Sequence, residues 1–185
     1  YNSNLIGSGK TVTVVEADEF DRSFLHLHPN IACITSMDAD HLDIYGTSEA
    51  IEESFLEFAS KIEDKSNLFI TKELPIEGIT CAVNEDAVFK AFNVRIGNGS
   101  YVFDVQTPTE VIKGLHFGLP GRHNLMNALM AIAMAKLFGT PTDAIAKAIM
   151  SFKGIKRRFS YQIKTEAKVY IDDYAHHPTE IKAVH

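Results

Sequence analysis

Two short apolar runs, each followed at once by acidic residues, are the feature that most constrains the fold of this chain. Residues 11–15 read TVTVV and residues 30–36 read NIACITS. Both runs are too short for a helix, so each is predicted to form a buried strand. The polar residues that follow them are Glu16, Asp18, Glu19 and Asp21 after the first run, and Asp38, Asp40, His41 and Asp43 after the second. Because ligands bind at the carboxyl ends of strands in open α/β sheets, both clusters are candidates for a binding site.

The segments that follow indicate parallel pairing of these strands. Residues 48–63 carry apolar side chains on one face of a helix, and residues 67–72 form the next predicted strand. Between residues 80 and 117, alternating stretches broken by GNG and TP predict hairpins. We therefore predict an α/β fold, with a mostly parallel sheet flanked by helices and an antiparallel hairpin extension.

The last third of the chain is predicted to hold two helices and two strands. The helix over 123–139 ends at Gly139, a residue type suited to the position after a helix. The helix over 140–152 opens with Thr140 and Pro141, and Asp143 stands where an acidic capping box needs it. Residues 157–163 and 168–175 are the predicted strands.

Composition excludes several classes of protein. The 185 residues are 45% apolar and carry a formal net charge of −6, so the electrostatic footprint of a nucleic-acid-binding protein is absent. No apolar run reaches the 18 residues of a membrane-spanning helix, and no secretory signal opens the sequence. Cys33 and Cys81 are expected to be reduced thiols in a cytoplasmic protein. Since Tyr1 is not an initiator and His185 lies within a helical pattern, we expect a piece of a longer protein.

A possible phosphate-binding loop lies near the start, in the Gly-Ser-Gly-Lys-Thr of residues 7–11. Such a loop requires another glycine five residues before the second glycine of this run, and that position is Asn4. It also requires a helix to follow, whereas a strand is predicted there. We interpret the run as a turn that leads into a strand, so Lys10 is not expected to bind ATP.

The two acidic clusters favour a divalent cation. An acid at the end of a strand can hold Mg²⁺ against nucleotide phosphates, although a solvated acidic turn explains Glu16 equally well in isolation. His41 lies among three carboxylates, and a site rich in oxygen suits Mg²⁺ or Mn²⁺ better than Zn²⁺. Ligation of a metal by His41 is therefore the favoured interpretation.

Three further groups of polar residues have both a functional and a structural interpretation. Asn124 and Asn127 share one face at a helix start, where they either read the edge of a base or cap the helix. The run Lys156, Arg157 and Arg158 forms either a phosphate clamp or a solvated basic turn. The last group gathers at the end of the final strand and consists of Asp172, Asp173, Tyr174, His176 and His177.

Five motifs in this order resemble the Mur ligases: EADEFDRSFLHLHP, DADHLDIYG, GLPGRHNLMNAL, GIKRRF and DDYAHHPTEI. The resemblance covers nearly the whole chain. It implies that residues 1–166 form the central ATP-binding domain of such a ligase without its phosphate-binding loop. It also implies that residues 167–185 are the first strand and helix of the C-terminal domain.

The resemblance also implies roles for individual residues. Glu16 would bind the Mg²⁺ shared by the β- and γ-phosphates, and His41 the second Mg²⁺. The other implied roles are adenine contacts for Asn124 and Asn127, a phosphate contact for Arg158, a ribose contact for Asp173, and the substrate side of the cleft for His176 or His177. Several related ligases carry a carbamylated lysine on the helix after His41, but this chain has Ser54 near that place, so the feature is not transferred.

The implied activity is ATP-dependent amide-bond synthesis in peptidoglycan formation, with UDP-N-acetylmuramate and L-alanine as substrates and an acyl phosphate as intermediate. The isolated piece is expected to be inactive, because the phosphate loop and the domain for the UDP-sugar are missing from it. Two alternatives remain open on the sequence: a divalent-metal phosphohydrolase built on the two acidic clusters, and a non-catalytic nucleotide-binding module.

Overall fold

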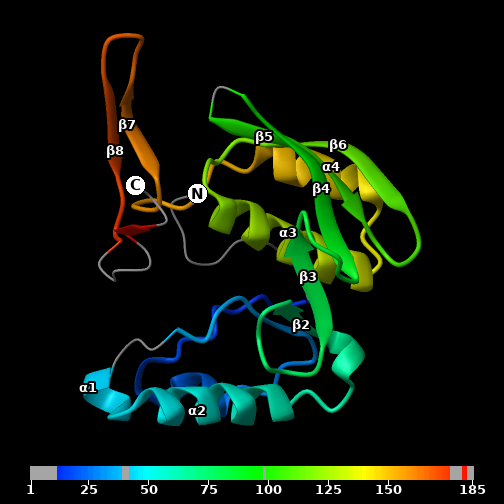
Figure 1. Ribbon diagram of the computed structural model, residues 1–185, viewed down its shortest axis with the longest axis vertical. Helices are drawn as coiled ribbons and strands as arrows, with labels where there is room; N and C mark the ends of the chain where they lie inside the picture. Colours follow the sequence, from blue (N-terminus) through cyan, green and yellow to red (C-terminus); the bar gives the residue numbers. More distant parts are fainter. Residues whose placement is uncertain (1–11, 39–41, 98, 176–180, 183–185) are drawn as a thin grey trace.

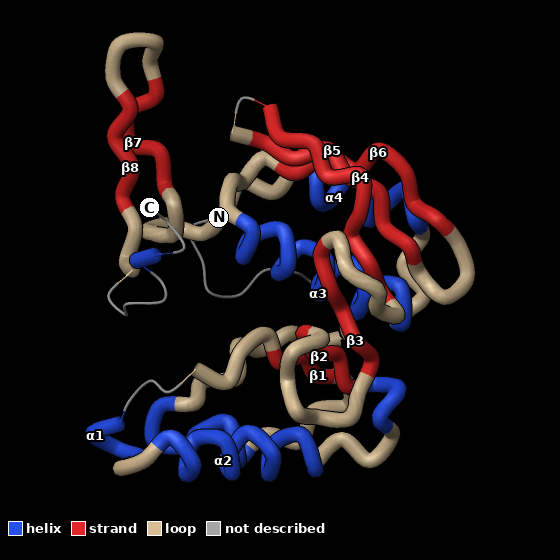
Figure 2. The backbone as a smooth tube through the Cα atoms, in the orientation of Figure 1, coloured by secondary structure: helices blue, strands red, loops and turns tan. Residues whose placement is uncertain are grey.

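A six-stranded sheet organises the part of the chain that the computed structural model describes, which is residues 12–38, 42–97, 99–175 and 181–182 (Figures 1 and 2). The strands lie in chain order, and β1 to β4 pair parallel whereas β4 to β6 pair antiparallel. Their bounds are β1 Ala32–Ile34, β2 Leu68–Thr71, β3 Ile79–Val83, β4 Phe89–Gly97, β5 Ser100–Gln106 and β6 Val111–Phe117. The predicted parallel sheet with an antiparallel extension is confirmed.

Helices cover both faces of the parallel strands. Helix α2 (Ser48–Ser60) packs with Leu68 and Ile70 of β2, whereas Phe69 belongs to the core beneath α3 (Arg122–Leu137). Successive side chains of a strand point to opposite faces, so a strand covered on both sides needs an unbroken apolar run. The buried run of β2 has this pattern, and Figure 1 shows α2 and α3 on opposite sides of β2.

Local sequence explains where the helices begin and end. Helix α2 starts after Thr47, whose hydroxyl accepts the Ala50 N–H at 3.3 Å, which is N-capping. Helix α3 ends just before Gly139, whose φ of 83° lies in the left-handed region that glycine tolerates, as predicted. The remaining helical elements are α1 Leu42–Tyr45, α4 Thr142–Ser151 and the 3₁₀ segments Phe20–His26 and Lys65–Asn67.

The predicted start of α4 is wrong by two residues. Pro141 is the N-cap, the helix begins at Thr142, and no side chain caps it. The Thr142 hydroxyl instead donates to the Glu110 carboxylate at 3.0 Å, next to Lys136. These side chains link α3 and α4 to the residue just before β6, which replaces the local cap with a tertiary contact.

The strand predicted over residues 11–15 does not form. Thr11 lies outside the described residues, and residues 12–15 adopt no regular structure, with Val14 89% exposed. Each described strand pairs only with other numbered strands, so no strand edge takes up this run. A β-branched sequence is stable as a strand only where another strand satisfies its backbone, and that condition is absent here.

Strands β7 (Ser160–Lys164) and β8 (Val169–Asp172) form a separate antiparallel hairpin, confirming the two strands predicted near the end of the chain. The hairpin stands beside the main body (Figure 1), and Ile163, Val169 and Tyr170 are largely exposed. It spans residue 166, the predicted domain boundary. No helix in the described part of the chain has the length and apolarity to cross a bilayer.

Both cysteines are unpaired, as predicted. Cys33 lies on β1 and Cys81 on β3, on the side of the sheet that α3 covers. Burial raises the pKa of the Cys33 thiol and raises that of Cys81 to about 12, so both thiols are protonated and inert at neutral pH.

Candidate functional site

A pocket of about 250 Å³ brings together residues from distant parts of the sequence. Its lining consists of Glu16, Ile155, Lys156, Arg157, Arg158 and Tyr174. Glu16 follows the irregular run after residue 11, the basic residues follow α4, and Tyr174 follows β8. The structure therefore places Glu16 and Arg158, two of the residues predicted for the site, around one cavity.

The basic turn of this pocket is held by Tyr174. The Arg157 guanidinium lies 4.4 Å from the centre of the Tyr174 ring, and the Tyr174 N–H donates to the Arg157 carbonyl at 2.8 Å. Arg157 has a φ of 63°, and the Arg158 N–H donates to the Ile155 carbonyl at 3.2 Å. Arg157 is exposed to solvent and its cation also packs on an aromatic face, so the choice between a phosphate clamp and a solvated basic turn stays a prediction.

Asp173, the predicted ribose contact, is tied into the base of the hairpin. One carboxylate oxygen accepts the Phe159 N–H and the other accepts the Ala175 N–H, both at 2.7 Å. These bonds connect the residue before β7 to the residues after β8. Asp173 thus fixes the position of the segment that carries Tyr174.

His123 at the start of α3 also belongs to this region, and sequence reasoning gave it no role. Burial lowers its pKa, the Arg158 charge lowers it further, and the Asp173 charge acts in the opposite direction. The ring lies against Gly121, where a Cβ atom would stand 2.6 Å from the His123 Cε1 atom. Gly121 also has a φ of 98°, so the backbone conformation requires glycine there, and a larger residue would in addition displace the His123 ring. The glycine before the helix is the signal that marks this close approach.

The two asparagines of α3 lie on its first turns. The Asn124 amide donates to the Pro120 carbonyl at 2.6 Å, and Asn127 is exposed one turn later. The N-cap of the helix is Gly121, which has no side-chain cap, so simple N-capping by Asn124 is wrong. Contacts of these amides with a base remain a prediction.

The acidic segment that contains Glu16 forms a tight turn. The Asp18 carboxylate accepts the Phe20 N–H at 3.0 Å, and the Asp18 carbonyl accepts the Phe24 N–H at 2.9 Å.

Among the residues that the structure describes, no three His, Cys, Asp or Glu side chains come close enough to hold a metal. The predicted ligand His41 lies outside those residues, as do His176 and His177. Ser54, which stands near the place where the resemblance would put a modified lysine, is buried and donates to the Ala50 carbonyl at 2.8 Å.

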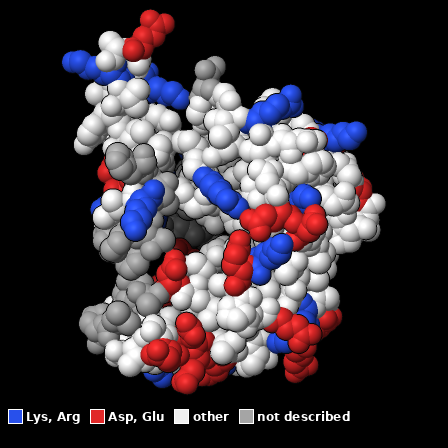
Figure 3. Space-filling model, viewed as in Figure 1, with Lys and Arg blue, Asp and Glu red and all other residues white. Residues whose placement is uncertain are grey.

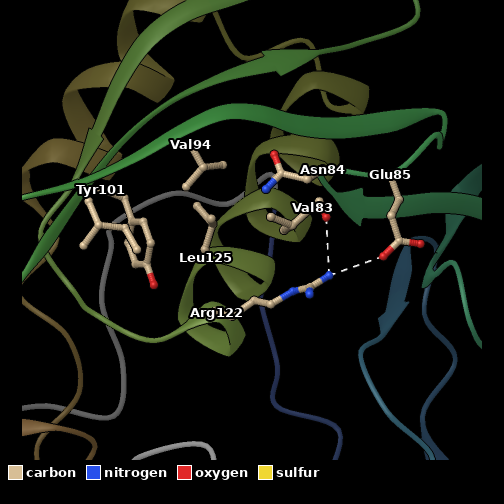
Figure 4. A pocket seen from close by; sticks show the side chains of 8 residues that line it. Val83, Asn84, Glu85, Val94, Tyr101, Arg122 and Leu125 are labelled. Atoms are coloured by element: carbon tan, nitrogen blue, oxygen red, sulfur yellow. Dashed lines mark hydrogen bonds and ion pairs between the residues drawn. The ribbon is translucent and has the colours of Figure 1, made fainter.

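A second pocket, of about 310 Å³, lies at the carboxyl end of β3 (Figure 4). The Arg122 side chain is part of its lining, and the guanidinium donates to the Val83 carbonyl at 3.3 Å and to the Glu85 carboxylate at 3.4 Å. Lys72 lies 3.8 Å from the other Glu85 oxygen. The polar run after β3 that supplies Asn84 and Glu85 was not singled out from the sequence, although it follows a strand, as the cluster that begins at Asp38 does. Figure 3 shows a hollow in this face of the molecule with acidic and basic side chains along its rim.

Comparison with known proteins gives concordant results. Two curated relatives, from Flavobacterium johnsoniae and Flavobacterium psychrophilum, are 81% and 72% identical over all 185 residues, and both are named UDP-N-acetylmuramate--L-alanine ligase. The chain spans 41% of the length of each. The solved UDP-N-acetylmuramate-alanine ligase of Thermotoga maritima is 25% identical to the chain and superposes with a TM-score of 0.76. The match covers 91% of this chain and 40% of the solved chain. A MurF structure from Acinetobacter baumannii shares the fold, with a TM-score of 0.75. That match covers 88% of this chain and 38% of the MurF chain.

The family itself is identified by a model of the Mur ligase middle domain, which matches residues 3–135. This range is well over half of the sequence and includes the sheet, α2 and most of α3. Both the predicted resemblance and the predicted fold class are confirmed. The chain belongs to the Mur ligase family.

Proposed function

We propose that this chain forms the ATP-binding part of the ligase that joins L-alanine to UDP-N-acetylmuramate in peptidoglycan synthesis. The observation that carries the proposal is the 81% and 72% identity, over the whole chain, to relatives named for that reaction. Because the chain spans about two fifths of those relatives, the activity is proposed for the whole protein. Residues 1–166 would belong to the central domain and residues 167–185 to the C-terminal one.

The lining of the Glu16 pocket fits a magnesium nucleotide. Lys156 and Arg158 offer cations to phosphate oxygens, and Glu16 offers a carboxylate, the ligand type that Mg²⁺ prefers. When bound, Mg²⁺ would neutralise phosphate charge that otherwise repels an attacking carboxylate. His41 is proposed as the second metal ligand, and Mn²⁺ could substitute for Mg²⁺ at both positions.

The remaining residues are proposed to position the nucleotide and the substrate. Asn124, which is partly buried, and Asn127, which is exposed, would contact adenine from the first turns of α3, and Asp173 at the hairpin base would contact ribose. His176 or His177 would face the UDP-sugar. Because the Asp173 carboxylate already accepts two backbone N–H groups, it would present an oriented lone pair to a ribose hydroxyl.

The proposed reaction takes place in the cytoplasm in two steps. A lactyl carboxylate oxygen of UDP-N-acetylmuramate attacks the γ-phosphorus of ATP, ADP leaves, and an acyl phosphate forms. The amino group of L-alanine then attacks the acyl carbon, and inorganic phosphate leaves as the amide bond forms. Arg158 would stabilise charge on the transferred phosphoryl group. The 185-residue chain alone is expected to be inactive.

The test is an assay of the full-length protein with ATP, L-alanine and UDP-N-acetylmuramate, scored by formation of UDP-N-acetylmuramoyl-L-alanine. Glu16→Gln keeps the size of the side chain and removes its charge, so kcat should fall by at least about 100-fold. Glu53→Gln, an exposed change of the same kind on α2, is the control and should leave kcat unchanged.

Two outcomes would contradict the proposal. Acceptance of UDP-N-acetylmuramoyl-L-alanine in preference to UDP-N-acetylmuramate would assign the chain to a later ligase. Mg²⁺-dependent release of phosphate without amide formation would favour the phosphohydrolase instead.

A further inference from the structure

The side chain of Tyr45 links two segments that are far apart in sequence. Tyr45 ends α1 and is only 6% exposed, and its hydroxyl donates to the Glu19 carbonyl at 2.6 Å. The two residues are 26 positions apart. Glu19 lies in the acidic segment 16–22, which begins with the predicted metal ligand Glu16. This bond therefore ties the acidic segment to α1.

A second contact between the same segments reinforces the bond. The Arg22 guanidinium carbon lies 5.3 Å from the centre of the Tyr45 ring, within the range of a cation–π interaction. The Arg22 N–H also donates to the Glu19 carbonyl at 3.0 Å, so this one oxygen accepts both a backbone and a side-chain donor. Both ends of Tyr45, hydroxyl and ring face, are thus engaged by the acidic segment.

The backbone of the acidic segment is strained where Tyr45 holds it. Asp21 and Arg22 are consecutive non-glycine residues with φ angles of 51° and 56°. Such conformations are unfavourable for residues with a Cβ and persist only where surrounding contacts impose them. Strain of this kind concentrates at functional sites, and here it lies within six residues of Glu16.

Tyr45 remains a hydrogen-bond donor over the working pH range. Burial raises the pKa of its phenol above the ordinary value of 10.0, and the adjacent Arg22 charge offsets this only in part. The bond to Glu19 thus persists at neutral pH.

We propose that Tyr45 is a positioning residue, which fixes the acidic segment so that the Glu16 carboxylate is presented to the metal of the bound nucleotide. The proposal rests on the proposed function, because it assumes a metal at Glu16. In this role Tyr45 would contact neither substrate nor cofactor. Its hydroxyl acts through the backbone of the segment.

The test removes the hydroxyl and keeps the ring. In the full-length protein with Tyr45→Phe, the Mg²⁺ concentration for half-maximal ATP-dependent ligation should rise about three- to tenfold, the range for one lost hydrogen bond. The kcat at saturating Mg²⁺ should stay within about twofold, since excess metal compensates for a loosely held ligand. Tyr161→Phe, which removes a hydroxyl from the β7–β8 hairpin, is the control and should change neither value.

Hydrogen exchange supplies a readout that is independent of activity. The Arg22 and Phe24 amides, which close the turn of the acidic segment, should exchange about three- to tenfold faster in Tyr45→Phe. The Leu129 amide in the core should be unchanged, which shows that the variant is folded. Arg22→Gln, a second variant on the surface, removes the contact with the ring and should shift the Mg²⁺ dependence in the same direction.

The outcomes separate the two proposals. Faster exchange with an unchanged Mg²⁺ dependence would make Tyr45 purely structural and would overturn the positioning role. An unchanged exchange rate together with an unchanged Mg²⁺ dependence would overturn that role as well. A wild-type protein that shows no ATP-dependent ligation overturns the proposed function, and the positioning role with it.

Discussion

The core beneath α3 and the region around the Glu16 pocket differ sharply in how much of their structure is buried. In the core, Leu129, Phe103 and Ala91 are fully buried between α3 and the sheet. Around the pocket, Glu16, Lys156 and Arg158 are exposed, and the neighbouring hairpin leaves Ile163 48% exposed. The comparison indicates that the fold and the proposed site depend on different parts of the chain, so each can be altered while the other is kept.

The largest effect is expected in the core. Leu129→Ala should lower the free energy of unfolding by about 2–5 kcal/mol, because it removes buried methylene groups and leaves a cavity. The matched variant Ile163→Ala, on the exposed hairpin, should cost less than about 1 kcal/mol. Urea unfolding of both variants measures the difference, and equal losses would show that the hairpin belongs to the same cooperative unit as the core.

A smaller, local effect is expected at the base of the hairpin. Asp173→Asn replaces a carboxylate that accepts two N–H groups by an amide with one acceptor, so one donor is left unpaired. The Phe159 and Ala175 amides should exchange about tenfold faster or more, with no change at Leu129.

Asp172→Asn is the control for this change, since it alters the same charge one residue earlier without touching those bonds. An equal increase in exchange in both variants would mean that net charge, rather than the two hydrogen bonds, holds the hairpin base together.

The smallest effect concerns pH. The pKa of His123 lies below its ordinary value of 6.5, chiefly because of burial, so the unfolded chain binds this proton more readily than the folded one. Its contribution to stability is therefore complete above pH 6.5 and decreases as the pH falls from there towards the lower pKa of the folded state. Urea unfolding should show a lower free energy of unfolding at pH 5.5 than at pH 7.5, and this difference should be smaller in His123→Gln. An identical difference in that variant would contradict the assignment of the pH effect to His123.

The sequence predicted correctly those helices and strands whose apolar pattern matches the layers that cover them in the fold. Helix α2 and strand β2 formed where expected, because an apolar face and an unbroken apolar run each meet a covering layer. Residues 12–15 have an equally strong β-branched pattern but no strand edge beside them, and pairing over long distance is not encoded in a local window. The start of α4 was missed for a related reason, since Thr142 bonds to Glu110, 32 residues away.

The candidate site was predictable only in part. Residue chemistry pointed to Glu16 and Arg158, and the structure brings both to one pocket. The bond from Tyr45 to Glu19 depends on how distant segments pack, so nothing in the local sequence marks it, whereas Gly121 is a local signal for the close approach of the His123 ring. His41, His176 and His177 lie outside the described residues and stay predictions.

The change from parallel to antiparallel pairing at β4 also has a consequence for the order of folding. Strands β4, β5 and β6 follow one another through short turns, so their pairing closes small loops that form within microseconds. Strands β1 and β2 are joined through α2, and their pairing must close a much longer loop at a greater cost in chain entropy. We therefore expect the β4–β6 meander to form early in folding and the parallel edge to be added later. The acidic segment packs against that later edge, so the candidate site would be among the last parts of the chain to become ordered.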